Sequence, residues 1–245
     1  MAVFMDFNIS YTTDKKRLQS VIETAAHLGY FTVAITYVVD LEQNKQEIGK
    51  PKCVSELFDT FPIVQGKSRP IKVLNRLTVV ASRAAHFKPL REYKAYDLVA
   101  AYPKTDKLFH AACMEFTIDI ICVAATEKHY TPAIRDSTMR RHTIANALNL
   151  MEACKGKNVI VTSGAEKVYY PLRYHSYDEG LLFGLSEEDG KAAISTNCRA
   201  VHLHGEMRKT ALGIVHSVKN EQPLTERQEK EDVPASKRAK IEMAQ

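Results

Sequence analysis

The sequence lacks three features that would place the protein in a membrane or a secretory compartment. No uninterrupted apolar run approaches the roughly 20 residues that a membrane helix needs, and the longest, residues 31–39, contains two threonines. The first ten residues, MAVFMDFNIS, have no basic start followed by an apolar stretch, so no secretory signal is predicted. The five cysteines never show C-x-x-C spacing, which argues against a disulfide framework and a cysteine-built zinc site. We therefore expect a reducing compartment and no membrane partner.

A large excess of one charge is also absent. The 245 residues include 34 Lys and Arg against 29 Asp and Glu, a net charge of +5. Residues 219–245 hold six charges of each sign, so residues 1–218 carry the whole excess. An apolar fraction of 45% is enough for a packed core. The balance permits binding to a polyanion without requiring it.

Strand and helix patterns alternate along most of the chain. Residues 2–9 alternate in hydropathy and predict a strand. A cap at 12–14, apolar side chains at helical spacing from Leu18 to Leu28 and a stop at Gly29 predict a helix before a second strand at 31–39. Further strands are predicted at 72–80, 97–102, 118–124 and 158–163, and helices at 136–154, 186–194 and 197–208. Six strands indicate an open doubly wound sheet or a (β/α) barrel, and periodicity does not choose between them.

The alternating pattern stops near Val218. Residues 219–245 are polar, contain two prolines and have few large apolar side chains, so we predict a disordered tail after a folded domain at 1–218. Within this tail, Lys237, Arg238 and Lys240 form a short basic cluster. Such a cluster is typical of a nuclear localisation signal and equally of an ordinary solvated tail.

Catalytic motifs are scarce. The side chains expected at the carboxyl ends of strands, where parallel α/β enzymes react, include Asp6, Asn8, Asp40 and Glu127. The H-x-H pair at 202–204 lies in a predicted helix, where residues two apart point in nearly opposite directions, so one packed and one exposed histidine are expected. No phosphate-binding glycine motif or nucleophile motif is present. We predict no catalytic site, metal site or cofactor. The alternative is a metal-dependent phosphoesterase that uses the four strand-end side chains.

Four groups of basic side chains give a stronger signal. One follows Gly66 in the loop QGKSRPIK, and a second flanks the predicted N-terminus of the 136–154 helix. A helix N-terminus is already electropositive, so an anion bound there would relieve the conflict with the arginines. The other two groups lie at 155–157 and within 197–209. Together they make binding to a phosphate backbone as plausible as an ordinary solvated surface.

Long segments of the chain resemble a known family. The segments include ETAAHLGY (23–30), FPIVQGKSRPIKVLNRLTVV (61–80), YDLVAAYPKTDKLFHAAC (96–113), PAIRDSTMRRHTIANALNLMEACKGKNVIVTS (132–163) and GLLFGLSEEDGKAAISTNCRAVHLHGEMRKTALGIV (180–215). They closely resemble the TIM-barrel protein subunit of eukaryotic nuclear ribonuclease P, which is shared with ribonuclease MRP. The similarity covers nearly all of residues 1–218.

The resemblance implies an α/β fold, a TIM-like (β/α) barrel related to the polymerase-and-histidinol-phosphatase metal hydrolases. It implies a nuclear and nucleolar protein without catalytic activity of its own, because the RNA of that complex removes the 5′ leader from precursor tRNA. Its implied partners are the catalytic RNAs of ribonucleases P and MRP and a small α/β protein subunit. The related hydrolases carry H-x-H on their first strand, where this chain has Asp6, Phe7 and Asn8.

The RNA- or partner-contacting residues are predicted from the basic groups under this resemblance. Their expected role is neutralisation of phosphate charge. They are Lys67, Ser68, Arg69, Lys72, Arg76, Arg135, Arg140, Arg141, Arg199, Arg208 and Lys209.

One departure from the family lies after Lys128. Between Lys128 and Pro132 only three residues are present, where family members carry about twenty more that form roughly one strand–helix unit. We therefore expect a barrel that lacks one strand–helix unit, which would leave unpaired strand edges. A form of the chain that no longer assembles with its partners is a further alternative.

Overall fold

The computed structural model describes residues 3–42, 48–58, 60–87, 93–123, 137–165 and 180–210. All of these lie in one compact unit, Met1–Ile214. The basic cluster Lys237, Arg238 and Lys240 lies outside the described residues, so the disordered tail, its localisation signal and the boundary at 218 stay predictions. Within the described ranges, no helix is both long and apolar enough to span a membrane.

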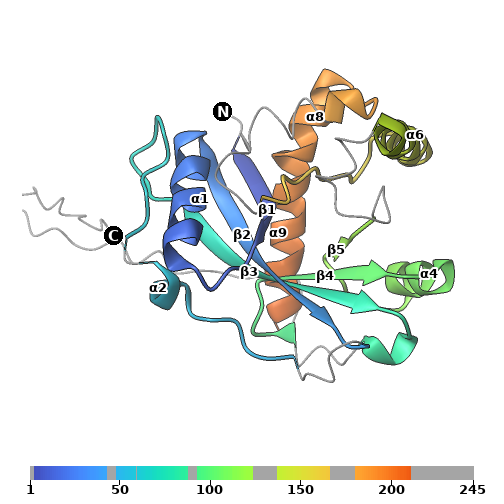
Figure 1. The fold of residues 1–245 in the computed structure, drawn as a ribbon, viewed down its shortest axis with the longest axis horizontal. Coiled ribbons are helices and arrows are strands. Elements are labelled where there is room, and N and C mark those ends of the chain that lie inside the picture. Colours follow the sequence, from blue (N-terminus) through green and yellow to red (C-terminus); the bar gives the residue numbers. More distant parts are fainter. Residues whose placement is uncertain are drawn as a thin grey trace, which may run out of the picture. The chain divides into compact units, whose positions relative to one another are not determined.

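Five parallel strands form a single sheet (Figure 1). They are β1 (Phe4–Ser10), β2 (Tyr30–Asp40), β3 (Lys72–Ala81), β4 (Leu98–Pro103) and β5 (Ile120–Ile121). Their order in the sheet is their order in the chain. A doubly wound sheet reverses its strand order at a switch point, whereas a barrel adds each strand beside the last one. The described sheet is therefore half of a TIM-like barrel, which confirms the barrel-type α/β fold that the resemblance implied and is consistent with a missing unit.

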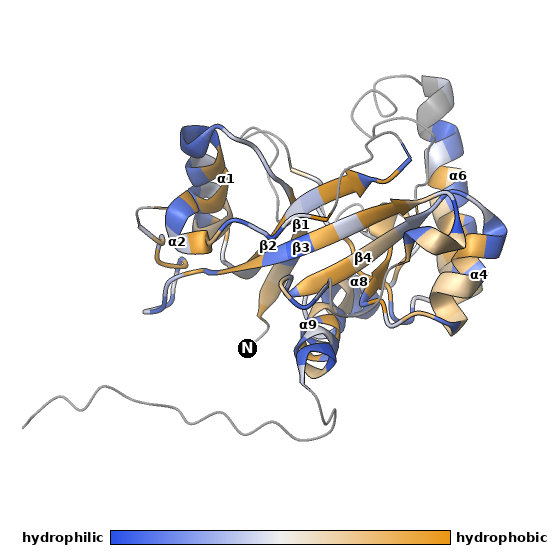
Figure 2. Ribbon diagram, turned by 90° about the horizontal axis from the view of Figure 1, so that it is seen from below, coloured by the Kyte–Doolittle hydropathy of each residue, from blue (hydrophilic) through white to orange (hydrophobic). Residues whose placement is uncertain are grey.

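The first helix follows the sequence pattern closely. Helix α1 (Lys15–His27) is capped by Asp14, whose carboxylate accepts a hydrogen bond of 3.1 Å from the Arg17 backbone N–H. The helix stops before Gly29, which adopts a positive φ of 86° that glycine tolerates without steric cost. The predicted apolar face is buried against β2. Figure 2 shows this helix hydrophobic toward the sheet and hydrophilic on its outer side.

The later helices also agree with their predicted ranges. They are α6 (Ser137–Cys154), α8 (Glu187–Ala193) and α9 (Thr196–Lys209). Between the strands lie α2 (Val54–Leu57), the 3-10 turn η1 (Ala84–His86) and α4 (Asp106–Met114). The elements α2 and η1 are too short to produce a detectable periodicity.

The prediction of a strand at 158–163 is wrong. This segment runs along the free edge of β1, where the Ser10 N–H donates to the Ala165 carbonyl at 3.2 Å. Two of its own N–H groups have other acceptors, because Ser163 donates to the Asp6 carboxylate and Val161 to the Ala193 carbonyl. A regular ladder needs those donors, so the segment stays extended without forming a sixth strand.

Two hydrophobic layers cover the sheet. The outer layer packs α1 against β2. The inner layer joins Met5 and Phe7 of β1 to Leu74 of β3 and Leu98 of β4, and it includes Cys198 of α9. Helix α9 therefore contributes to the interior of the half-barrel and holds together strands that are distant in sequence.

Candidate nucleic-acid interface

Helix α9 lies across the amino ends of the strands. The Ile194 carbonyl, just before α9, accepts a 2.8 Å hydrogen bond from the Met5 N–H near the start of β1. The other contacts of the helix are with Lys72, the first residue of β3, and with Asp97 and Asp119, which directly precede β4 and β5. The chemistry of barrel enzymes takes place at the opposite, carboxyl ends.

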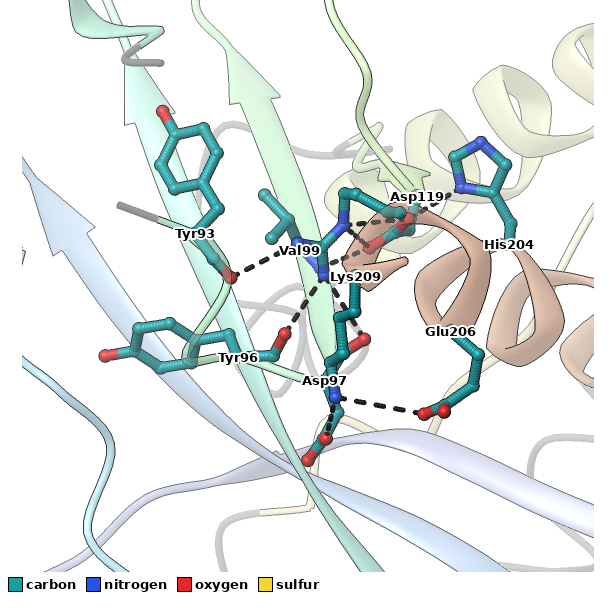
Figure 3. A network of polar contacts seen from close by, with 9 residues as sticks. Tyr93, Tyr96, Asp97, Val99, Asp119, His204, Glu206 and Lys209 are labelled. Atoms are coloured by element: carbon teal, nitrogen blue, oxygen red, sulfur yellow. Dashed lines mark hydrogen bonds and ion pairs between the residues drawn. The ribbon is translucent and has the colours of Figure 1, made fainter. Parts of the chain in front are cut away.

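The buried Arg208 fixes α9 in this position. Figure 3 shows the network to which its partners Tyr93, Tyr96 and Asp119 belong. The Arg208 Nε donates to the Asp119 carboxylate at 3.1 Å, and both side chains are fully buried. Its Nη1 donates to the Tyr93 carbonyl at 3.2 Å, and its Nη2 to the Tyr96 carbonyl at 3.0 Å. The guanidinium therefore bonds the loop before β4 and the residue before β5 at once. The predicted contact of Arg208 with RNA is wrong, because the protein itself surrounds the side chain.

The remaining polar side chains on this side of α9 support the same packing. The His204 Nδ1 lies 2.6 Å from the Asp119 carboxylate. Lys209, another predicted RNA contact, forms ion pairs with Asp97 and, at 3.8 Å, with Glu206. Gly205 allows close approach, since a Cβ atom there would lie 2.5 Å from the Asp97 carbonyl oxygen. These contacts make the amino end of the sheet a tightly connected surface.

Two of the predicted basic groups meet at this surface. The Lys72 Nζ lies 2.9 Å from His202 Nε2 on α9. Burial, and then the nearby Lys72 charge, lower the pKa of His202, so the neutral ring accepts a hydrogen bond from the ammonium group. Arg199 lies one turn earlier on α9 and is exposed. The expectation of one packed and one exposed histidine is wrong, because His202 and His204 are both half-buried and Leu203 between them is exposed.

The loop that leads into β3 places further cations at the same end. Lys67, Ser68 and Arg69 are exposed at the tip of a hairpin whose Val64 N–H donates to the Arg69 carbonyl at 3.1 Å. The Gln65 N–H donates to the Ala26 carbonyl in the last turn of α1, and that turn precedes the start of β2. We call the exposed cations of this end the amino-end cationic face: Lys67, Arg69, Lys72 and Arg199.

Arg76 is a second predicted RNA contact that the structure contradicts. It lies on the inner face of β3 and is 3% exposed. Its Nη1 donates to the Phe7 carbonyl at 2.7 Å, and its Nη2 to the Cys122 sulfur at 2.9 Å. This arginine stabilises the barrel interior and does not reach the surface.

The predicted cluster at the start of α6 is only partly described. Arg141 is exposed on the first turns of α6. Arg135 and the side chain of Arg140 lie outside the described residues. The interaction of this group with an anion therefore stays a prediction.

The acidic side chains that the alternative phosphoesterase would use are engaged in internal bonds where the structure describes them, and Asp6 lies inside β1 and not at its carboxyl end as predicted. Asp6 is buried, and its carboxylate accepts hydrogen bonds from the Ser163 hydroxyl and, at 3.1 Å, from the Asn8 N–H. Burial raises the pKa of Asp6. Asp40 forms a 3.3 Å ion pair with Lys104. Glu127 lies outside the described residues, and among the residues within them no three His, Cys, Asp or Glu side chains converge in a group fit to hold a metal.

Sequence reasoning missed the acceptors that hold α9. Asp97 and Asp119 each stand directly before an apolar strand, and the first one opens the predicted strand at 97–102. A carboxylate at this place bonds strand N–H groups, since Asp119 accepts from Val99 at 2.7 Å and Asp97 from Asn75 at 2.8 Å. An aspartate directly before an apolar strand occurs twice, and this pattern could have indicated carboxylates at the amino ends of the strands. Their arginine and lysine partners lie about a hundred residues away, so the sequence pattern did not identify them.

Comparisons with known proteins agree with this fold. The chain is 51% identical over 272 aligned positions to mouse "Ribonuclease P protein subunit p30", covering 99% of this chain and all of that protein. It is 25% identical to fission yeast "Probable ribonuclease P protein subunit 3", over 84% of this chain and 95% of that one. A chain in a cryo-EM structure of archaeal ribonuclease P with mature tRNA shares the fold with a TM-score of 0.58, at 12% identity, covering 88% of this chain and 99% of that one.

Two of these comparisons agree with the missing segment that was predicted after Lys128. The alignment with the mouse protein is 27 positions longer than this 245-residue chain. The model of the family described as RNase P subunit p30 matches in two pieces, residues 3–129 and 124–210. The two pieces meet where the sequence lacks about one strand–helix unit, and together they span nearly the whole folded region. The chain therefore belongs to the ribonuclease P subunit p30 family.

Proposed function

We propose that this chain acts as a non-catalytic protein subunit of ribonuclease P and supports removal of the 5′ leader from precursor tRNA. The observation that carries the proposal is the 51% identity to the mouse subunit across the entire length of both chains. The proposed partners are the catalytic RNAs of ribonucleases P and MRP and the small α/β protein subunit. The proposed location is the nucleus and nucleolus, with a role in rRNA processing through ribonuclease MRP.

The amino-end cationic face supports a role in binding RNA. Its cations come from the hairpin before β3, the start of β3 and helix α9, which the fold brings to one end of the sheet. Lysine and arginine in such an arrangement neutralise phosphates without reading sequence, so binding should weaken steeply as salt rises. Helix α9 is fixed by buried bonds, and therefore Arg199 is presented on a rigid element.

The proposal is tested by replacing the mouse subunit with this chain in mouse cells. A tagged copy should co-purify the catalytic RNA, and the extract should cleave the 5′ leader of precursor tRNA at a rate near that of unaltered cells. The matched control is a chimera that carries the additional mouse positions after Lys128. If the chimera co-purifies the RNA and this chain does not, the short form fails to assemble. Failure of both proteins would contradict the proposed function.

A further inference from the structure

The hairpin before β3 exposes apolar side chains on its outer face. Phe61 is 40% exposed and Ile63 is 66% exposed. They are two residues apart in an extended arm and therefore share a face. Pro70, which pairs with Ile63 across the hairpin, is exposed as well. The exposed parts of Phe61 and Ile63 therefore form an apolar surface on the outer face of the hairpin.

The hairpin is held rigidly despite this exposure. Val64 and Ile71 are 2% and 3% exposed and belong to the core beneath α1. The Ile71 N–H donates to the Pro62 carbonyl at 3.0 Å, which closes the hairpin. The Phe61 ring contacts the buried Phe58 ring, with 5.9 Å between the centroids. One side of the Phe61 ring therefore packs against the core. Because the ring is already ordered, stacking of a ligand on it costs little side-chain conformational entropy.

The same hairpin carries cations and no carboxylate. Residues 60–72 contain Lys67, Arg69 and Lys72 but neither Asp nor Glu. Gly66 at the tip has a φ of +71°, and no atom lies within 4 Å of the place where a Cβ would be. The backbone there is open to close approach by a ligand. The nearest described acid on α1, Glu23, accepts a hydrogen bond from Gln19, whose amide also reaches the Thr60 carbonyl.

We propose that this hairpin binds an unpaired RNA segment, with a base stacked on Phe61 and Ile63 and neighbouring phosphates neutralised by Lys67 and Arg69. Aromatic rings accept any base by stacking, and cations beside them track the backbone of a single strand. Extended residues rise about 3.3 Å each, so the ring lies roughly 10 Å from the Val64–Arg69 pair at the tip. The inference rests on the proposed function and specifies the RNA as single-stranded at this place.

The absence of tryptophan makes a direct test possible. In the full chain, Phe61→Trp introduces the only indole, at a position exposed enough to accept it. The probes are single-stranded oligouridylate and oligoadenylate of about ten nucleotides and an RNA duplex of the same length. Stacking should quench the indole fluorescence with the single strands and not with the duplex. The matched control is Phe109→Trp on α4, because Phe109 has nearly the same exposure, 41%, and lies outside the hairpin.

Affinity measurements give the second readout. Phe61→Ala should weaken binding of the single strands by about tenfold or more, and Phe61→Tyr should retain it. Equal affinity of Phe61→Ala and the unaltered chain, or quenching that is equal at Phe109→Trp, would overturn the stacking proposal. Quenching by the small α/β protein subunit in place of RNA would overturn it too and identify a protein contact. The mouse-cell replacement decides the proposed function separately, since cleavage can be restored by a chain whose Phe61 stacks on nothing.

Discussion

The two ends of the sheet differ in how they use charge. At the carboxyl ends, Asp40, the last residue of β2, is paired with Lys104. The Asp6 carboxylate is buried inside the sheet, at the third residue of β1, and is bonded to Ser163. At the amino ends, Lys67, Arg69 and Arg199 are exposed, and buried arginine–aspartate bonds are used only to hold α9. A barrel enzyme needs reactive groups at its carboxyl end. Among the described residues of this chain, the carboxyl-end Asp40 is engaged in an ion pair with Lys104, and the opposite end carries exposed cations suited to a phosphate backbone.

Loss of the α9 anchor should have the largest effect on stability. Arg208→Met removes the buried guanidinium that pairs with the Asp119 carboxylate, and breaking one side of a buried ion pair costs about 3–5 kcal/mol. Urea unfolding followed by circular dichroism measures the loss. The control, Arg199→Met on the same helix, should change stability by about 0.5 kcal/mol or less because its side chain is exposed. Similar losses in both variants would show that α9 is not held by this arginine.

Charge reversal should weaken RNA binding at the amino end of the sheet and not at its carboxyl end. The amino-end double variant Lys72→Glu with Arg199→Glu should bind RNA about tenfold or more weakly, and its log–log salt slope should fall by about two. The carboxyl-end control is the double variant Arg83→Glu with Lys107→Glu, two exposed side chains that follow β3 and β4. It changes the net charge equally and should bind nearly as well as the unaltered chain. Filter binding at several salt concentrations measures both. An equal loss in the two variants would mean that RNA responds to net charge alone.

A pH series should reveal the ionisation of the buried Asp6 carboxyl group inside β1. Burial raises the folded-state pKa of Asp6 above its ordinary value of 3.8, so the stability contributed by its protonated form is complete below pH 3.8 and is lost as pH rises through the folded pKa. Asp6→Asn does not ionise, and its stability relative to the unaltered chain should therefore increase as pH rises. Urea midpoints of both proteins across this range measure the difference. A stability difference that does not change with pH would contradict the raised folded-state pKa of Asp6.

The smallest effect on stability is expected from the titration of His202 at the amino end. Its dependence on pH is opposite in sign to that of Asp6. Burial and Lys72 lower the folded-state pKa of His202 below 6.5, so its contribution is present above pH 6.5 and is lost as pH falls through the folded pKa. The ring is only half-buried, which limits the size of the effect. Relative to His202→Gln, the unaltered chain should lose stability on acidification below pH 6.5, as followed by thermal unfolding. A gain would contradict the assigned hydrogen bond from Lys72.

The sequence predicted the parts of the fold that depend on local chemistry. The Asp14 cap, the apolar face of α1 and the Gly29 stop all lie within one stretch, so they fixed that helix closely. The segment at 158–163 has the composition of a strand, but the carboxylate of Asp6 and a carbonyl before α9 compete for its donors. Competition of this kind depends on contacts between distant residues, which a local pattern does not contain.

The candidate site shows the same limit. The charged residues were identifiable, yet charge alone does not determine exposure. Arg76 lies in a largely apolar central strand, and its side chain turns inward. Arg208 has its acceptors before β4 and β5. The missing strand–helix unit was predictable because the resemblance to the family supplies the spacing expected between Lys128 and Pro132. The exposed apolar face of the hairpin was not predictable, because the sequence alone does not show whether Phe61 and Ile63 are buried in the core or exposed.

The position of α9 has a consequence for the timing of synthesis on the ribosome. Lys72 and Arg208 are separated by most of the folded region, and translation at about 5–20 residues per second takes on the order of ten seconds to cover that distance. During this time the nascent sheet has no element across its amino ends, and Asp119 has no arginine to neutralise it. The emerging chain therefore completes the amino-end cationic face only after α9 has left the exit tunnel, so the proposed contact of this face with RNA is expected to follow the synthesis of α9.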